Sequence, residues 1–150
     1  MVAVTASPHV EAIPGWHVSQ AYYPPIAAGE STKRNPIFTA PFRCELGEVA
    51  IINSTLVSGA NTNTVHLNLI NGGSEGAGTT ELDTIDLVSG TDLIVGKTLL
   101  FDNIQGASAE VFLTQGDILE LESEEIWTGL GAAINAFMLY IVFRPANLSS

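Results

Sequence analysis

Residues 109–123 read Ala-Glu-Val-Phe-Leu-Thr-Gln-Gly-Asp-Ile-Leu-Glu-Leu-Glu-Ser, and this stretch decides the fold class. From Leu119 to Glu122, apolar and acidic side chains alternate. Successive side chains of a β-strand point to opposite faces. The alternation therefore predicts a strand with its leucines on a dry face and its glutamates on a wet face.

A turn separates the two halves of this stretch. Gly116 stands where a type II turn needs a positive φ, and Asp117 closes the turn. Before the turn, Val111 and Leu113 fall on one face of a strand, and Glu110 and Phe112 fall on the other. We therefore predict an antiparallel hairpin on the surface of an all-β domain, and none of its residues suggests catalysis.

The same pattern continues along the rest of the chain. Eight strands are predicted, at residues 37–42, 45–53, 64–71, 81–88, 93–101, 109–113, 117–123 and 133–144. Turns rich in glycine, serine and asparagine separate them, and no stretch keeps a helical period. These features favour an all-β sandwich, of which the eight-stranded jelly roll is the best-known form.

Length and composition favour one domain that needs no disulfide or other cross-link. A chain of 150 residues buries about 70% of its unfolded surface, which suffices for a core. Cys44 is the only cysteine, so no internal disulfide forms, as is usual inside cells. We expect no secretory signal at the N-terminus. Glycine and asparagine interrupt the uncharged run 126–143, which predicts a loop and a buried strand rather than a membrane helix.

Residues 1–36 differ from the rest in composition. They hold five of the seven prolines, together with Trp16, Tyr22 and Tyr23. Proline removes amide donors, while disordered tails are poor in aromatics. We therefore predict an extended N-terminal arm at 1–36 and a β-sandwich domain at 37–150. The aromatics would dock either on this domain or on another subunit.

The formal net charge is −11, and its distribution is uneven. Residues 75–125 contain twelve acids and one base, Lys97. Such a surface repels nucleic acid and anionic lipid, so we expect neither as a partner. The acids serve either solubility alone or docking onto a basic protein surface.

Two stretches resemble catalytic motifs but lack the required context. Residues 72–76 match Gly-x-Ser-x-Gly, yet no helix start follows and all three histidines precede Ser74. Residues 90–98 end in Gly-Lys-Thr, but five residues separate the glycines where a phosphate-binding loop needs four. Both stretches are interpreted as loops.

Metal sites are not indicated either. Cys44 and the histidines lack zinc-site spacing. The acids near residues 81–86 and 122–125 could hold calcium, but they are typical of a solvated strand face. We expect no metal, no cofactor and no enzyme activity; a catalytic site shared between subunits is the remaining enzymatic alternative.

Residues 37–145 resemble the small jelly-roll decoration, or cement, proteins on the heads of tailed bacteriophages. Five segments carry the resemblance: Ala-Pro-Phe at 40–42, Asn-Thr-Asn-Thr-Val-His-Leu-Asn-Leu-Ile-Asn-Gly-Gly at 61–73, Gly-Ala-Gly-Thr-Thr-Glu-Leu at 76–82, Gly-Asp-Ile-Leu-Glu-Leu-Glu at 116–122 and Phe-Arg-Pro at 143–145. The resemblance covers about three quarters of the chain and lies in style and order rather than in one diagnostic motif.

The resemblance implies a virion protein on the outer capsid surface, made in the host cytoplasm. It implies a homotrimer that binds the major capsid protein where capsomers meet and stabilises the shell. The arm contacts would be Trp16, Tyr22, Tyr23, Pro24 and Pro25. A second contact would be an acidic face of Glu120, Glu122, Glu124 and Glu125.

Two other binding roles stay open. One is another trimeric phage part, such as a head-fibre base or a tail-tip receptor binder, with recognition in loops 58–63 and 126–133. The other is a carbohydrate-binding module. Its sugar platform would need two or three exposed aromatics, whereas the strand and loop segments contain a single tryptophan, Trp127.

Overall fold

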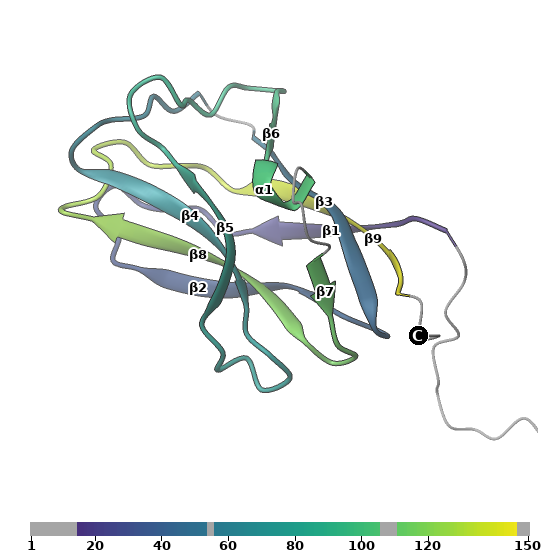
Figure 1. Ribbon diagram of the computed structural model, residues 1–150. Helices are drawn as coiled ribbons and strands as arrows, with labels where there is room; N and C mark the ends of the chain where they lie inside the picture. The colour runs from purple at the N-terminus through teal and green to yellow at the C-terminus, as the bar shows by residue number, and fades with distance from the viewer. Residues whose placement is uncertain (1–14, 54–55, 106–110, 147–150) are drawn as a thin grey trace, which may run out of the picture.

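The computed structural model describes residues 15–53, 56–105 and 111–146, which form two antiparallel sheets packed face to face (Figure 1). The five-stranded sheet contains β1 (His17–Tyr23), β9 (Phe137–Pro145), β3 (Cys44–Ile52), β6 (Thr98–Leu100) and β7 (Val111–Leu113). The four-stranded sheet contains β2 (Lys33–Thr39), β8 (Ile118–Ile126), β4 (Thr64–Asn71) and β5 (Thr80–Asp86). A single helical turn, α1 (Asp102–Gln105), follows β6.

The strand order is that of a jelly roll. The sheets run β1-β9-β3-β6 and β2-β8-β4-β5, with β7 as an additional partner of β3. With β7 left aside, the strands pair from the two ends of the chain inward: β1 with β9, β2 with β8, β3 with β6 and β4 with β5. This is one long hairpin rolled into a sandwich. The predicted fold class is confirmed, with nine strands among the described residues instead of eight.

The core lies between the sheets and follows from the alternation along each strand. In β9 the side chains of Phe137, Leu139 and Ile141 are buried, while those between them point outward. Leu119 and Leu121 of β8 face them from the other sheet, as predicted. Aromatic rings also join the layers: Phe38 of β2 and Phe143 of β9 have centroids 4.8 Å apart.

The predicted hairpin at 109–123 is wrong in its pairing but right in its turn. The amide of Asp117 donates to the carbonyl of Thr114 over 3.0 Å, and Gly116 has a φ of 88°. However, β7 pairs with β3, whereas β8 pairs with β2 and β4. Because both edges of β8 are occupied within the four-stranded sheet, the turn carries the chain from one sheet to the other.

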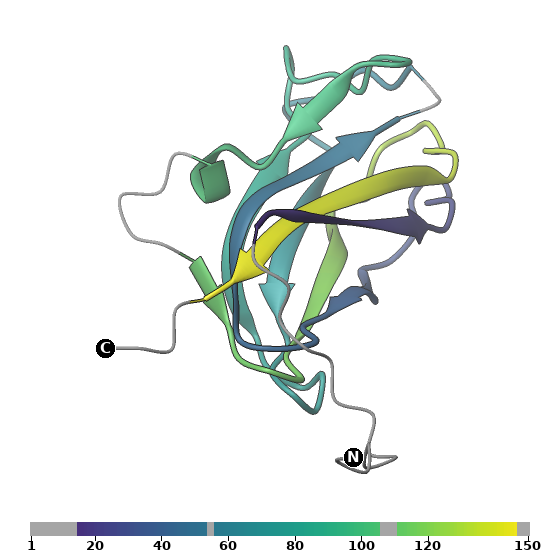
Figure 2. The same cartoon turned by 90° about the vertical axis from the view of Figure 1, so that its right-hand side faces the viewer.

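The predicted boundary between an arm and a domain at residue 36 is also wrong. β1 and the first four residues of β2 lie before it, and both strands are integral to the sandwich. Figure 2 shows β1, in purple, beside the yellow β9 along its length. Pairing with partners about 120 residues away gives β1 hydrogen bonds along one edge, and the prolines that flank this strand hide it at the sequence level. Residues 1–14 of the predicted arm lie outside the described residues.

The other predicted strands agree with the structure to different degrees. The strand predicted at 64–71 has the bounds of β4. Within 93–101, only Thr98–Leu100 form a strand, while Leu93 makes an isolated bridge to Val57. The uncharged run after Ile126 is a loop followed by β9, as expected. In the part of the chain that the structure describes, no helix has the length and apolar character needed to cross a membrane.

Candidate interaction surfaces

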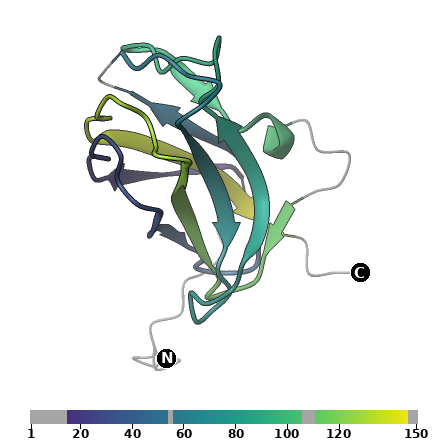
Figure 3. The same cartoon turned by 90° about the vertical axis from the view of Figure 1, so that its left-hand side faces the viewer.

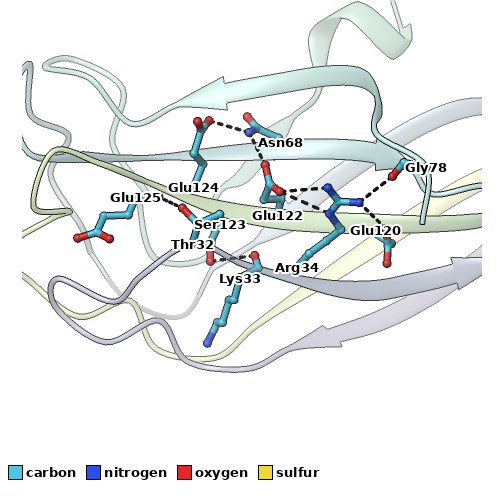
Figure 4. A network of polar contacts seen from close by, with 10 residues as sticks. All are labelled: Thr32, Lys33, Arg34, Asn68, Gly78, Glu120, Glu122, Ser123, Glu124 and Glu125. Atoms are coloured by element: carbon cyan, nitrogen blue, oxygen red, sulfur yellow. Dashed lines mark hydrogen bonds and ion pairs between the residues drawn. The ribbon is translucent and has the colours of Figure 1, made fainter. Parts of the chain in front are cut away.

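An ion-pair network occupies the outer face of the four-stranded sheet (Figure 4). Arg34 of β2 donates from Nη1 to the carbonyl of Gly78 over 2.7 Å. Its guanidinium lies 3.3 Å from a carboxylate oxygen of Glu120 and 3.4 Å from one of Glu122. Glu120 is only 7% exposed, although the sequence predicted it on a wet face. This carboxylate is therefore a structural ion-pair partner, and the prediction that it docks on another protein is wrong.

The loop between β4 and β5 covers Glu120, and its glycines make this possible. A Cβ added to Gly72 would lie 2.6 Å from the Glu120 carboxylate, and one added to Gly78 would collide with the backbone of Gly72. The Gly78 amide donates to the Gly72 carbonyl over 2.7 Å. The Gly-x-Ser-x-Gly segment is thus a close-packed loop, as its sequence predicted, and β5 rather than a helix follows it.

A second polar row crosses the same face. Asn68 of β4 donates to Glu122 over 3.1 Å and to Glu124 over 2.9 Å, and it accepts from the Thr84 hydroxyl over 2.7 Å. The Nδ1 atom of His66 lies 3.3 Å from a carboxylate oxygen of Asp86 and 3.7 Å from one of Glu124. Figure 3 views the molecule from the side on which β4 and β5 lie in front. The outer face of this sheet is therefore an ordered array of hydrogen bonds rather than separate solvated acids.

The four predicted docking glutamates do not share one face. Glu124 points outward, whereas Glu125 has the opposite parity along β8 and points away from the network in Figure 4. Its backbone amide donates to the Thr32 hydroxyl over 2.9 Å. Of the four, Glu124 has the most accessible side chain in the outer array, at 40%. Together with Asp86, it leaves this face anionic, because the network holds more carboxylates than its one arginine can balance.

The predicted arm residues separate into buried and exposed groups. Tyr23 is fully buried and stacks on Phe137 at a centroid distance of 5.0 Å, so the prediction that it contacts a partner is wrong. Trp16 and Tyr22 remain exposed on the outer face of the five-stranded sheet. Their exposure follows from alternation along β1, which turns Tyr23 inward.

Pro24 and Pro25 open the loop between β1 and β2. Pro24 is half-buried and Pro25 is exposed. The carbonyl of Pro25 accepts a hydrogen bond from Lys33 Nζ over 2.9 Å, and the same ammonium binds Glu30 over 2.9 Å. The hydrogen bond from Lys33 holds the pKa of Glu30 below its usual value. These contacts fix the loop within the sandwich.

Among the described residues, the outer face of the five-stranded sheet carries few charges, and Arg144, Glu45 and Glu48 each have a side-chain partner there. Arg144 binds Glu45 over 2.7 Å and stacks over the ring of Trp16 at 4.6 Å. The Tyr140 hydroxyl donates to Glu48, and this hydrogen bond raises the pKa of Tyr140 to about 12. The sequence pattern does not reveal this face, because prolines and glycines flank His17–Tyr23, in which Val18, Gln20 and Tyr22 are the outward positions.

The remaining candidate sites have structural roles. Asp83 accepts hydrogen bonds from the Asn103 amide and side chain over 2.9 and 2.8 Å, which fixes α1. The 90–98 stretch forms turns in which Asp92 binds the Gly59 amide over 2.9 Å. Among the described residues, no group of three or more His, Cys, Asp or Glu side chains could hold a metal ion. Cys44 is buried, and this burial raises the pKa of its thiol to about 11.

Comparisons with known proteins leave the family open. No protein-family model matches the chain, and no curated protein matches it. A solved structure of infectious bursal disease virus, Gx strain, is 15% identical in sequence, with a TM-score of 0.28. The likeness covers 92% of this chain and 31% of that one. A TM-score this low does not indicate a shared fold, so functional proposals rest on the residues of the chain itself.

Proposed function

We propose that this chain is a non-enzymatic structural protein of a virion, a decoration or cement protein that binds the outer surface of a tailed-phage head. The observation that carries the proposal is the jelly-roll strand order, which is the fold that the sequence resemblance implied. The proposal adds a homotrimer that contacts the major capsid protein and holds adjacent capsomers together. Several weak contacts on one trimer would act together through their high effective concentration.

The anionic face of the four-stranded sheet is the proposed contact with the shell. Glu124 and Asp86 keep accessible carboxylates there, with side-chain exposures of 40% and 44%. Their outward positions suit a basic protein surface. Interactions between exposed charges are screened by salt, so binding through this face would weaken as ionic strength rises.

The test is co-sedimentation of the purified chain with phage heads that lack it. Saturable binding that raises the heat resistance of the heads would support the proposal, and Glu124→Gln should weaken binding most at low salt. Glu75→Gln is the matched control, because Glu75 is exposed in the β4–β5 loop. Failure to sediment with heads, together with absence of the chain from purified particles by mass spectrometry, would refute the virion role.

One observation favours a second candidate, a receptor-binding or sugar-binding part. Trp127 is 81% exposed in the loop after β8 and has a φ of 62°. A bulky side chain in this backbone region is strained, and such strain is frequent at binding sites. Under this alternative, Trp127→Ala would abolish adsorption to host cells or binding to a glycan array while leaving head binding unchanged.

A further inference from the structure

The two sheets part along one edge of the sandwich, and a groove lies there between β5 and β6. β5 is the last strand of the four-stranded sheet, and β6 ends the path of the five-stranded sheet. Figure 3 shows β5 at this edge with α1 beside it. Two cavities of about 390 and 360 Å³ adjoin there and share Thr91, Leu99 and Asp102 in their lining. We call the two cavities together the β5 groove, and its apolar lining residues include Val88, Leu93, Ile94, Leu99 and Leu100.

The polar lining of the β5 groove is mainly acidic. Among the described residues, three aspartates and no base line the cavity beside β5: Asp83, Asp86 and Asp102. Asp92 and Lys97 line only the other cavity. Asp83 and Asp92 accept hydrogen bonds from backbone amides of the fold, so their positions are fixed. The side chain of Asp86 is 44% exposed and Asp102 is exposed, which leaves these two carboxylates accessible to a partner.

The backbone of β5 also offers free groups at this edge. The amide of Leu87 donates to the carbonyl of Val65 in β4 over 3.1 Å, and the backbone groups of a strand alternate between its two edges. Those of Thr84 and Asp86 therefore point away from β4. The amide of Thr84 donates to the Asp83 carboxylate over 2.8 Å. Within the part of the chain that the structure describes, the carbonyl of Thr84 and both backbone groups of Asp86 remain for an incoming strand.

Charge indicates which partner can use this edge. Charged side chains on an edge strand normally oppose pairing, and these carboxylates repel another copy of the chain, whose net charge is −11. Its bases are also few, and Lys33, Arg34 and Arg144 are engaged in ion pairs. A segment that carries lysine or arginine meets opposite charge instead. The groove therefore suits a basic partner and disfavours self-pairing.

We propose that the β5 groove binds an extended segment of another protein that carries lysine or arginine, and that this segment adds to the free edge of β5. Main-chain hydrogen bonds to Thr84 and Asp86 align the segment. Asp86 and Asp102 bind its basic side chains, while its apolar side chains cover Val88 and Leu99. This contact deepens the anionic contact with the shell, and it rests on the proposed function only for the identity of the partner as a capsid protein.

The experiment is a fluorescence anisotropy titration of a labelled heptapeptide, in which valine and lysine alternate, with the full chain at low salt. We expect saturable binding, and loss of binding when glutamate replaces lysine in the peptide. Thr91→Arg should abolish binding of the lysine peptide, because it places bulk and positive charge where the two cavities join. Thr79→Arg is the matched control, since it makes the same change at an exposed position of the β4–β5 loop and should keep the affinity of the unmodified protein.

A second variant tests the charge of the groove without filling it. Asp102→Asn keeps the size of the side chain and removes one accessible carboxylate, so it should weaken binding up to about fivefold at low salt. Glu75→Gln is its control, because Glu75 is exposed in the β4–β5 loop. Urea unfolding shows whether each variant is folded, and Asp102→Asn decides the test if Thr91→Arg is not.

The outcomes separate the groove from general attraction to an acidic protein. Binding that folded Thr91→Arg leaves unchanged, or that each control weakens as much as its groove variant, would overturn the inference. Equal binding of a fully N-methylated lysine peptide, which has no amide donors, would also overturn it, as would tighter binding of spermine than of the peptide. Because the assay contains no phage heads, failure of head binding leaves the groove unaffected, and failure of the peptide to bind refutes the groove even where heads bind.

Discussion

Arg34 is the residue on which the polar face of the four-stranded sheet depends. It binds Gly78, Glu120 and Glu122 at once, although these residues lie 44, 86 and 88 positions away. A planar guanidinium with several fixed donors can hold such a set, whereas an ammonium cannot. The network therefore links β2 to β8 and to the β4–β5 loop.

Arg34→Met should lower the free energy of unfolding by about 2 kcal/mol or more, because it leaves the buried Glu120 carboxylate without its cation. Urea denaturation at neutral pH measures this effect. Arg144→Met is the control. The Arg144 side chain is 44% exposed in its ion pair with Glu45, so this substitution should lower the free energy of unfolding by about 1 kcal/mol or less. Equal losses in both variants would contradict a structural role specific to Arg34.

Cys44 makes the stability of the protein sensitive to alkaline pH. Its thiol is buried, and burial followed by the charge of Asp117 raises its pKa from 9.0 to about 11. The folded protein favours the protonated thiol. The free energy of unfolding therefore keeps its full value below pH 9 and falls as pH rises toward 11. Tyr140, with a pKa raised to about 12, extends the loss to higher pH.

We expect the urea midpoint to decline between pH 9 and pH 11, and Cys44→Ala to make this decline shallower. The same burial predicts slow reaction of Cys44 with thiol reagents at pH 8 until the chain unfolds. A midpoint that declines equally with and without Cys44, or fast labelling of the folded protein, would contradict this account.

At the scale of elements, the turn between β7 and β8 directs the chain from one sheet to the other. Gly116 has a φ of 88°, and Asp117 accepts from the Thr114 amide over 2.9 Å and from Asn71 over 3.3 Å. The turn is thus tied both to its own backbone and to the end of β4. Its geometry ends one strand and begins another in a different sheet, which a hairpin would not do.

Gly116→Ala should cost about 1 kcal/mol, since an L-residue is strained at this φ even though the space around it is open. Gly131→Ala is the control, because its surroundings are equally open and its φ is not in the left-handed region. That variant should stay within about 0.5 kcal/mol of the unmodified protein. Similar unfolding midpoints for the two variants would show that the backbone conformation of Gly116 is not limiting.

At the scale of the whole molecule, the N-terminal strands are part of the fold. Deletion of residues 1–36 removes β1, half of β2 and the buried side chains Tyr23 and Ile26. We expect that fragment to lack cooperative unfolding by circular dichroism, because the core loses one edge of each sheet. Deletion of 1–14 keeps every strand of the described residues and is therefore the variant that tests the arm on heads. A cooperative 37–150 fragment would contradict the observed architecture.

The sequence by itself determined the fold class, the positions of most strands and the inward face of β8. Two examples are the alternation of Leu119 and Leu121 with acids and the bounds of the strand at 64–71. Both depend only on neighbours along the chain and on the two-residue period of a strand. The positive φ at Gly116 is equally local. These features are readable because each needs only a few consecutive residues.

Only the tertiary structure decided which strands pair and what the exposed residues do. β1 joins β9, and Glu120 meets Arg34, through contacts between segments about 120 and 86 residues apart. Alternation assigns a face to each side chain but names no partner. Hence a glutamate at a wet position is buried under a glycine-rich loop, and the described part of the predicted arm contains β1 and the first half of β2.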